Sequence, residues 1–529
     1  METFIPVKGE RNMNPKEKRM KRQVFKLAIV MTVIMVIFTM AGCRRDSGLS
    51  RPANELIVIQ SSDAVSMDPH RSNDSHSARA WMQIYDGLVT LDPDMNVVPA
   101  LAREWTLIDD YTWQFTLNQG VRFHNGDEMK ASDVKFTFDR HTDPAMAAPA
   151  SFMLTTVRET RVIDDYTVQI ITSQPSASLI FNLTHPGMGI LSERAVREAG
   201  DNYATNPVGT GPFRFVEWVR NQRVVLERYN DYFQGPPSIE RVVIRIIPEG
   251  ATAMAELMAG SADMVFEVST QFADQFRPGS GMTLEHFSTF SLMYLSFDMR
   301  EEPFNDVRVR RAINYAIDNQ ALITMAWSGF GQQLRGPLPP FVNGVNDTLT
   351  GYPFDLERAR ALMAEAGHSN GFSSTLFISD SDIHGRIGTV LQAQLREIGI
   401  NLTLQILEWG AFLERTAQGV PMFVLSWFTV TADADNGMYA LFHSNSHGSR
   451  GNRSFYTNNE VDRLLDAGRA EFNVPVRMNM YQRAQEIILD EAPWGFLAAT
   501  EYLVGRSNRV RGFVPMPTTF FKFYGYSLE

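Results

Sequence analysis

The chain contains a single cysteine, Cys43, among its 529 residues. No intramolecular disulfide can therefore form, and a fold of this length must be stabilised by buried apolar side chains. Apolar residues make up 44% of the chain and charged residues 21%, as in soluble globular proteins. Because one core rarely organises more than about 250–300 residues, the sequence predicts two or three domains.

The segment before Cys43 has the layout of a secretory signal. A basic stretch at residues 16–26 precedes the uncharged run 27–40, and a small Ala-Gly pair follows. The run is shorter than the roughly 20 apolar residues that a membrane-spanning helix needs. A cysteine directly after the small pair resembles the lipobox of bacterial lipoproteins. That resemblance implies a lipoprotein signal peptide at residues 1–42.

The lipoprotein interpretation makes Cys43 the site of lipid attachment and the N-terminus of the processed protein. A lipid-anchored tether at residues 43–53 would then lead into the fold, with several acyl chains providing stable anchoring to a bacterial membrane. Met40 stands where a lipobox usually has leucine, and an uncleaved N-terminal anchor is the alternative. Translation could also start at Met13 or Met20. In every case we expect the rest of the chain to lie outside the cytoplasm, in the periplasm or at the cell surface.

The charge of the chain argues against nucleic acid as a partner. The net charge is −11, and the basic signal segment makes the remaining residues still more acidic. An acidic surface repels phosphate backbones and anionic membrane faces. We therefore expect no nucleic-acid binding, and membrane contact through the lipid alone.

The hydrophobic pattern mixes strands and helices without a regular period. Continuous or alternating apolar residues predict strands at 55–60, 112–117, 162–171 with a turn at 164–165, 224–227, 242–247 and 401–408. Helical spacing and glycine stops predict helices at 251–259, 306–323, 356–366, 387–398, 461–470 and 476–491. This mixture is typical of α/β lobes.

Eight sequence blocks follow one another in an order known from one protein family. The first block, at residues 98–141, reads VPALAREWTLIDDYTWQFTLNQGVRFHNGDEMKASDVKFTFDRH. The others are NPVGTGPFRFVEW, NDYFQGPPSIERVVIRIIPE, FNDVRVRRAINYAID, LERARALMAEAGHSNGF, LQAQLREIGINLTLQILEWGAF, FYTNNEVDRLLDAGR and EAPWGFLAATEYLVG. Together they make residues 54–517 resemble the family 5 extracytoplasmic solute-binding proteins, which serve ABC importers for peptides, glutathione, nickel and similar solutes.

The resemblance implies an α/β fold of the bilobal periplasmic-binding-protein-like type (class II, cluster C), with an extra inserted domain and a two-segment hinge. Lobe I would comprise residues 54–75, 205–285 and 495–529, the inserted domain residues 76–204, and lobe II residues 286–494. The hinge segments would lie near 285–296 and 493–500. The family further implies a cofactor-free monomer that captures a small peptide-like solute and delivers it to ABC permease and ATPase subunits.

The resemblance also points to a ligand-binding loop with one departure. In peptide-binding members, an aspartate in a block like GWTxDxxDPDN pairs with the ammonium of the ligand. The matching stretch here is SWFTVTADADNGMYALFHS, in which Trp427 aligns with the tryptophan and Val430 occupies the aspartate position. Valine cannot neutralise an amine, whereas Asp433 and Asp435 can. For both aspartates the alternative is a solvated loop or an N-cap. Glutathione-binding members resemble this loop better.

Further ligand contacts are implied by position in the family pattern. Arg386 falls at or next to the arginine that holds the ligand carboxylate in dipeptide binders, and its alternative is an exposed arginine in a first helical turn. Val65, Ser66 and Met67 resemble the segment that pairs with bound peptides through its backbone, as an added strand would.

We divide the aromatic residues between a wall of the ligand site and the hydrophobic core. Trp427 and Phe428, next to Thr429, would form an apolar wall of the site. We assign five other tryptophans to core packing. The preference is slight for Trp409 and strong for Trp105, Trp113, Trp218 and Trp494.

Other function classes have less support in the sequence. His124 with Asp127, or His141 with Asp139, could be drawn as acid–base pairs of a secreted hydrolase, but no GxSxG, HExxH or paired-cysteine pattern occurs. The ten histidines include one HxxxH pair, His443 and His447, and no HxH pair, so a metal site made by protein alone has little support. A binder of a nickel chelate, of haem or of another non-peptide solute, and a sensory receptor subunit, remain the alternatives.

Overall fold

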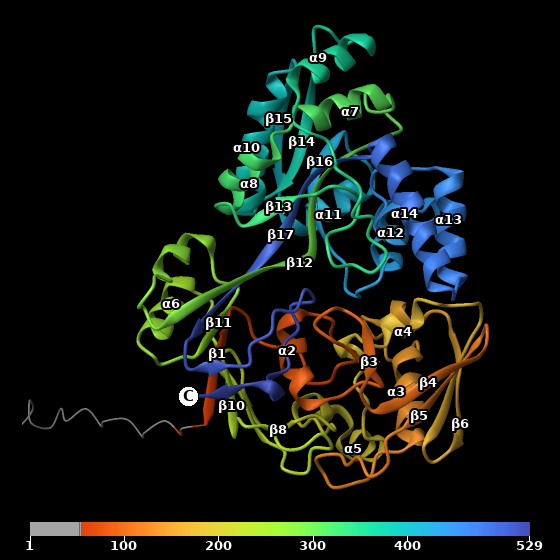
Figure 1. Cartoon of the computed structure of the whole chain (residues 1–529), viewed down its shortest axis with the longest axis vertical. Helices are drawn as coiled ribbons and strands as arrows, with labels where there is room; N and C mark the ends of the chain where they lie inside the picture. Colours follow the sequence, from red (N-terminus) through yellow and green to blue (C-terminus); the bar gives the residue numbers. More distant parts are fainter. Residues whose placement is uncertain (1–51, 53) are drawn as a thin grey trace, which may run out of the picture. The chain divides into compact units, whose positions relative to one another are not determined.

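The structure, a computed structural model, describes Pro52 and residues 54–529 (Figure 1). The predicted signal peptide, Cys43 and the tether other than Pro52 lie outside the described residues. In the described part of the chain, no helix is long and apolar enough to cross a membrane.

Two long strands connect the halves of an 11-stranded sheet, in the order β15-β14-β16-β12-β17-β11-β1-β10-β9-β8, with β13 (Gly331–Gln333) paired to β17. The long strands are β12 (Met282–Phe297) and β17 (Trp494–Ser507), which run antiparallel to each other. Their pairing is interrupted between Ser288 and Leu292. Figure 1 shows both strands passing from one half of the molecule into the other. They correspond to the predicted two-segment hinge.

We call the half that contains β14 to β16 lobe II. Its strands β14 (Phe372–Ser379), β15 (Ile400–Leu407) and β16 (Met422–Phe428) pair in parallel. Side chains of β16 alternate between two cores, because successive residues of a strand face opposite sides. One core holds α7 (Val307–Ala316), α8 (Asn319–Trp327), α9 (Leu356–Glu365) and α10 (Asp382–Arg396). The other holds α11 (Trp409–Ala417), α12 (Ala434–Phe442), α13 (Asn459–Ala470) and α14 (Val474–Glu491).

We call the half that contains β1 lobe I. Strand β1 (Glu55–Gln60) pairs in parallel with β10 (Arg241–Ile246) and β11 (Met264–Phe266). The antiparallel strands β8 (Phe213–Val219) and β9 (Arg223–Arg228) extend the sheet beyond β10. The remaining elements are α2 (Ser75–Ile84), α6 (Gly250–Met258) and the small pair β18 (Val510–Arg511) with β19 (Ser527–Leu528).

A separate antiparallel sheet of four strands has its own core. Its order is β4-β5-β7-β6, formed by β4 (Ala102–Asp109), β5 (Thr112–Leu117), β6 (Val157–Asp164) and β7 (Thr167–Thr172). Also in this part of the chain are β2 (Val89–Leu91), β3 (Val97–Pro99), α3 (Ala131–Thr142), α4 (Leu179–Asn182) and α5 (Glu193–Ala199). All of these elements fall within the predicted inserted domain at 76–204. Helix α2 also falls in this range except for its first residue, but it packs in the core of lobe I. The exact domain boundaries stay a prediction.

Most predicted elements are confirmed with small shifts at their ends. The strands at 55–60 and 112–117 have the predicted bounds, and the 162–171 segment is the β6–β7 hairpin. The single helix predicted at 306–323 is wrong, because the chain forms α7 and α8 with Ile317 in an extended conformation between them. Asp318 then accepts a hydrogen bond from the Ala321 N–H and caps α8.

Candidate functional site

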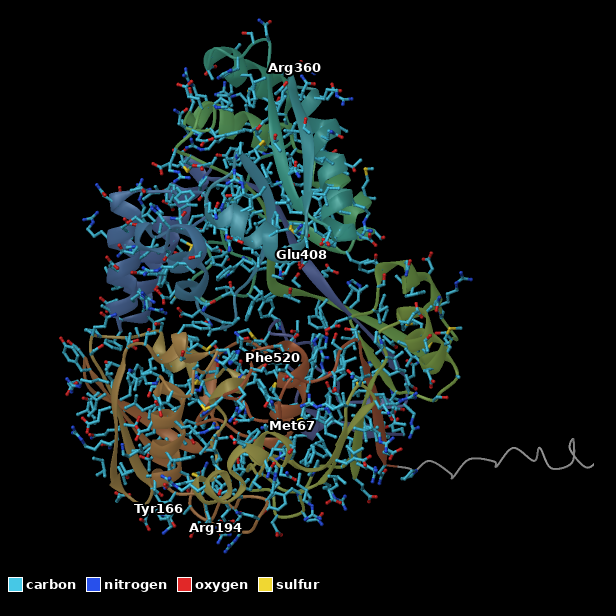
Figure 2. All side chains as sticks on the ribbon, turned by 180° about the vertical axis from the view of Figure 1, so that it is seen from behind. Met67, Tyr166, Arg194, Arg360, Glu408 and Phe520 are labelled. Carbon is cyan, nitrogen blue, oxygen red and sulfur yellow. The ribbon has the colours of Figure 1, made fainter. Side chains whose placement is uncertain are left out.

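The carboxyl ends of the parallel strands in both lobes point toward the same region. In lobe II, β16 runs antiparallel to β12 and ends at Phe428 opposite Ser291, near the middle of β12. In lobe I, β11 runs antiparallel to β17 and ends at Phe266, on the side of lobe II. Ligands of open α/β sheets usually bind at such carboxyl ends. In Figure 2, Glu408 at the end of β15 and Phe520 of lobe I lie where the two lobes face each other.

The predicted ligand loop lies at the end of β16. Trp427 and Phe428 are the last residues of this strand and are partly buried. The Thr429 N–H donates a hydrogen bond of 3.0 Å to the Phe290 carbonyl, so the loop continues from the sheet directly onto the hinge strand β12. Val430 follows with a partly exposed side chain. The loop thus connects lobe II to the hinge.

Two ion pairs, one of them buried on both sides, hold the next turn. Asp433 accepts a hydrogen bond from the Asp435 N–H and is the N-cap of α12, which confirms the N-cap alternative. Both carboxylate oxygens of Asp433 lie 2.6 Å from the Arg477 guanidinium, and the two side chains are 1% and 3% exposed. The Asp435 carboxylate lies 3.0 Å from Arg469 Nε. Burial raises the pKa of Asp435, and the charge of Arg469 opposes this shift. Both aspartates thus already have a cationic partner inside the protein, and a ligand role for either stays a prediction.

Two cavities meet at Val430. The first, which we call the Arg450 pocket, has a volume of about 460 Å³ and is lined by Val430 and, among others, Phe152, Asn182, Trp427, Tyr439 and Arg450. The second, which we call the Phe520 pocket, has a volume of about 270 Å³ and is lined by Val430 and, among others, Met82, Leu91, His185, Phe520 and Lys522. Each cavity therefore combines Val430 of lobe II with residues from outside lobe II.

Arg386 lies on the edge of a third cavity, of about 640 Å³, at the carboxyl ends of β14 and β15. It is exposed in the first turns of α10, and its Nε donates a hydrogen bond of 3.2 Å to the Ala326 carbonyl. The helix starts at Asp382, five residues before the predicted start, because the Ser381 hydroxyl caps it. The carboxylate-binding role of Arg386 stays a prediction.

The segment Val65–Met67 is already bonded within lobe I. The Val65 side chain is 59% exposed, whereas Ser66 and Met67 are buried. The Val65 N–H donates to the Ser77 hydroxyl at 2.8 Å, and the Ser66 carbonyl accepts from the Trp81 indole at 2.8 Å. The Met67 N–H donates to the Ala204 carbonyl at 3.1 Å. Backbone pairing with a ligand would have to use the remaining groups, and it stays a prediction.

Comparison with known proteins decides the family. The family described as bacterial extracellular solute-binding proteins, family 5 Middle, matches residues 96–449. The chain belongs to this family. The glutathione-binding protein GsiB of Salmonella typhi is 32% identical to this family 5 protein over 483 residues, which cover 89% of this chain and 94% of GsiB.

Solved structures of similar proteins share the bilobal fold of this family 5 protein. The periplasmic binding protein DppA from Helicobacter pylori, in complex with the peptide STSA, is 30% identical with a TM-score of 0.75, covering 90% of this chain and 98% of that one. HbpA2 from Haemophilus parasuis is 28% identical with a TM-score of 0.84, covering 90% and 100% of the two chains.

The histidine–aspartate pairs considered for hydrolysis have other contacts in this family 5 protein. His124 Nε2 lies 2.9 Å from the Gly211 carbonyl, and Asp127 forms an ion pair of 2.7 Å with Arg194. Asp139 pairs with Lys135 at 2.7 Å. These contacts give His124, Asp127 and Asp139 partners other than those of the two sketched pairs.

A polar cluster at the end of β11 also differs from a catalytic triad. Ser61 Oγ lies 3.2 Å and Glu267 Oε2 lies 3.3 Å from the same nitrogen, Nε2 of His76. In a triad, the nucleophile and the carboxylate contact opposite ring nitrogens. Although burial opposes the shift, the hydrogen bond from His76 and the charge of Arg79 lower the pKa of Glu267 to about 2. Glu267 is therefore ionised beside the hinge, where it pairs with Arg79 at 3.5 Å.

The tryptophans correct one core assignment. Trp494 is 1% exposed and Trp113 is buried, which confirms both as core residues, and Trp105 and Trp218 are partly buried. The core assignment of Trp409 is wrong, since this residue is 46% exposed. It is the first residue of α11, where Phe412 on the next turn stacks against its ring and His384 approaches the ring edge-on.

Sequence reasoning missed the charged residues that line the cavities. Arg450 lies in a Gly- and Ser-rich loop with no periodic pattern, and Arg469 belongs to a predicted helix without any motif. Lys522 lies in the C-terminal segment, where it forms an ion pair with Asp86. Each becomes part of a site only through contacts between distant chain segments.

Proposed function

We propose that this family 5 protein captures a peptide-like solute between its lobes and delivers it to the permease and ATPase subunits of an ABC importer. The observation that carries the proposal is the meeting of two cavities at Val430, between the carboxyl ends of parallel strands in both lobes. The names of similar proteins, a glutathione-binding protein and a binding protein in complex with the peptide STSA, support a peptide-like ligand. No bond of the solute is changed in this function.

Binding follows from the two-lobe geometry. A ligand in the cavities touches Val430 on one lobe and residues such as Phe520 or Phe152 on the other side. Contacts that exist only when both sides meet the ligand favour a closed arrangement, in proportion to their free energy. The strands β12 and β17 are the connections about which the lobes would rotate.

Peptide binding should raise the thermal stability of the protein. At a ligand concentration 100 times the dissociation constant, the free energy of unfolding should increase by about 2.7 kcal/mol. We would measure melting curves of residues 44–529 with glutathione and with the peptide STSA, using monosaccharides as controls. Unchanged melting with both peptides at millimolar concentration would contradict the proposal.

We also propose that Cys43 carries a lipid that anchors the protein outside the cytoplasm. The basic, apolar and small segments before Cys43 support this reading. The Cys43→Ser variant lacks the thiol, so it should incorporate no palmitate and should leave the membrane fraction or remain unprocessed. Metabolic labelling with a palmitate analogue checks this, and equal labelling of the variant and the wild type would contradict lipid attachment at this residue.

A further inference from the structure

The Arg450 pocket contains a cation that the protein does not neutralise. Arg450 ends the short turn Gly448–Arg450 and is exposed, and its Nη1 donates a hydrogen bond of 3.1 Å to the Asn445 carbonyl. None of the described carboxylates forms an ion pair with it. The other charged groups in the lining are Asp435 and Arg469, which pair with each other. The pocket therefore has a net positive charge.

A second donor without a partner belongs to a residue that lines the same pocket. Trp427 lines it, and the buried Nε1 of its indole has no hydrogen-bond partner in the described part of the chain. An indole N–H can only donate, so it favours an acceptor such as a carboxylate oxygen. A buried donor without a partner is unfavourable, and a ligand acceptor would remove this cost.

The walls of the pocket are aromatic and include no free carboxylate. Phe152 contributes a largely exposed ring from outside lobe II, and the Tyr439 ring is covered by the Arg469 guanidinium at 3.7 Å. Val430, at the junction with the Phe520 pocket, is apolar. An ammonium group would find Asp435 already paired, whereas an anion would find Arg450 unpaired.

We propose that the Arg450 pocket binds a carboxylate group of the peptide ligand, held by the Arg450 guanidinium with the Trp427 N–H as a second donor. This assignment rests on the proposed function and specifies which end of the ligand faces this pocket. Guanidinium groups bind carboxylates through two parallel hydrogen bonds, and such charge-assisted bonds are about twice as strong as neutral ones. The apolar atoms next to the carboxylate pack against Phe152 and Val430.

The test compares ligands with and without the negative charge on variants of two arginines. Arg450→Gln removes the cation, and Arg415→Gln is the matched control, because Arg415 is also exposed on lobe II with one backbone hydrogen bond, at 3.1 Å to Gly419. Two pairs of ligands are compared, each consisting of a free acid and its neutral derivative. One pair is the peptide STSA and its C-terminal amide, and the other is glutathione and its diethyl ester. Isothermal titration gives the dissociation constant of each pair.

The wild type should bind each carboxylate form about 10- to 100-fold more tightly than the neutral form. Arg450→Gln should lose most of this preference, and Arg415→Gln should retain it. If acid and neutral forms bind the wild type equally, or if Arg450→Gln keeps the preference, the carboxylate assignment is wrong while the proposed function stands. If neither peptide binds the wild type in any form, the proposed function is contradicted, and this assignment falls with it.

Discussion

Asp433→Asn should lower the free energy of unfolding by about 3–5 kcal/mol, because it removes one partner of a buried ion pair. The two Asp433 oxygens contact the Arg477 guanidinium at 2.6 Å, and both side chains are almost inaccessible to water. Asparagine can still cap α12 through its side-chain oxygen. The variant therefore removes the carboxylate that contacts the buried Arg477 directly, and leaves neutral contacts to the Gly468 carbonyl and the Tyr481 hydroxyl. The nearby Asp435 charge is already paired with Arg469.

The matched control for this variant is Asp306→Asn. Asp306 is likewise an N-cap, of α7, and it pairs with Arg308 at 2.6 Å, but the Arg308 side chain is 45% exposed. An exposed ion pair contributes less than about 1 kcal/mol, so the control should unfold almost like the wild type. Chemical denaturation followed by circular dichroism measures both. Equal loss of stability in the two variants would show that burial does not increase the effect of removing the Asp433 charge.

Acidification from pH 7 to pH 5 should lower the free energy of unfolding by about 4 kcal/mol through His124 and His185 alone. Burial lowers the pKa of His124 to about 4 and, together with the charge of His141, lowers that of His185 to about 4. In the unfolded chain, a histidine has a pKa of about 6.5. Between these values the unfolded chain binds protons that the folded protein does not, so stability falls with pH. Burial lowers the pKa of His70 and His141 as well, which adds in the same direction.

Urea denaturation between pH 5 and pH 7 measures this slope. In the wild type, His185 Nδ1 accepts a hydrogen bond of 3.1 Å from the Gly187 N–H. His185→Asn keeps an acceptor at this position but removes the titrating ring. The pH dependence of this variant should be shallower than that of the wild type. His368→Asn, in a partly exposed position, is the comparison variant. A wild-type stability that rises toward pH 5 would contradict the burial of neutral histidines.

The sequence predicted elements whose causes are local. ELIVIQ at 55–60 is a strand because its apolar run is buried on both faces, and the helix before Gly367 ends where the chain adopts a positive φ that glycine favours. The order of family blocks predicted the bilobal fold. The split of 306–323 was missed, since apolar spacing continues across the turn and only Asp318, acting as an N-cap, indicates the break.

The sequence predicted where the candidate site lies, but not which of its charged residues are paired. The loop at 427–435 was identified from the family pattern, and it does line the cavities. The partners of its aspartates, Arg477 and Arg469, lie more than 30 residues further along the chain, on helices whose sequence gives no sign of this contact. Arg450 is likewise unpaired because the tertiary structure brings no described carboxylate close enough to form an ion pair with it. Electrostatic balance in a cleft is a property of the tertiary structure.

The shared pair of β12 and β17 restricts how the two lobes can move. Both strands belong to one continuous sheet, and the hydrogen-bond ladder between them is interrupted only near Ser288–Leu292 and Met293–Tyr294. Ladder hydrogen bonds resist shear along the strands, whereas an interruption increases local twist and bending. The torsional compliance of the connection is thus concentrated in a few residues, next to the Phe290 carbonyl that holds the ligand loop. We therefore expect relative motion with essentially one rotational degree of freedom, which carries the loop with it.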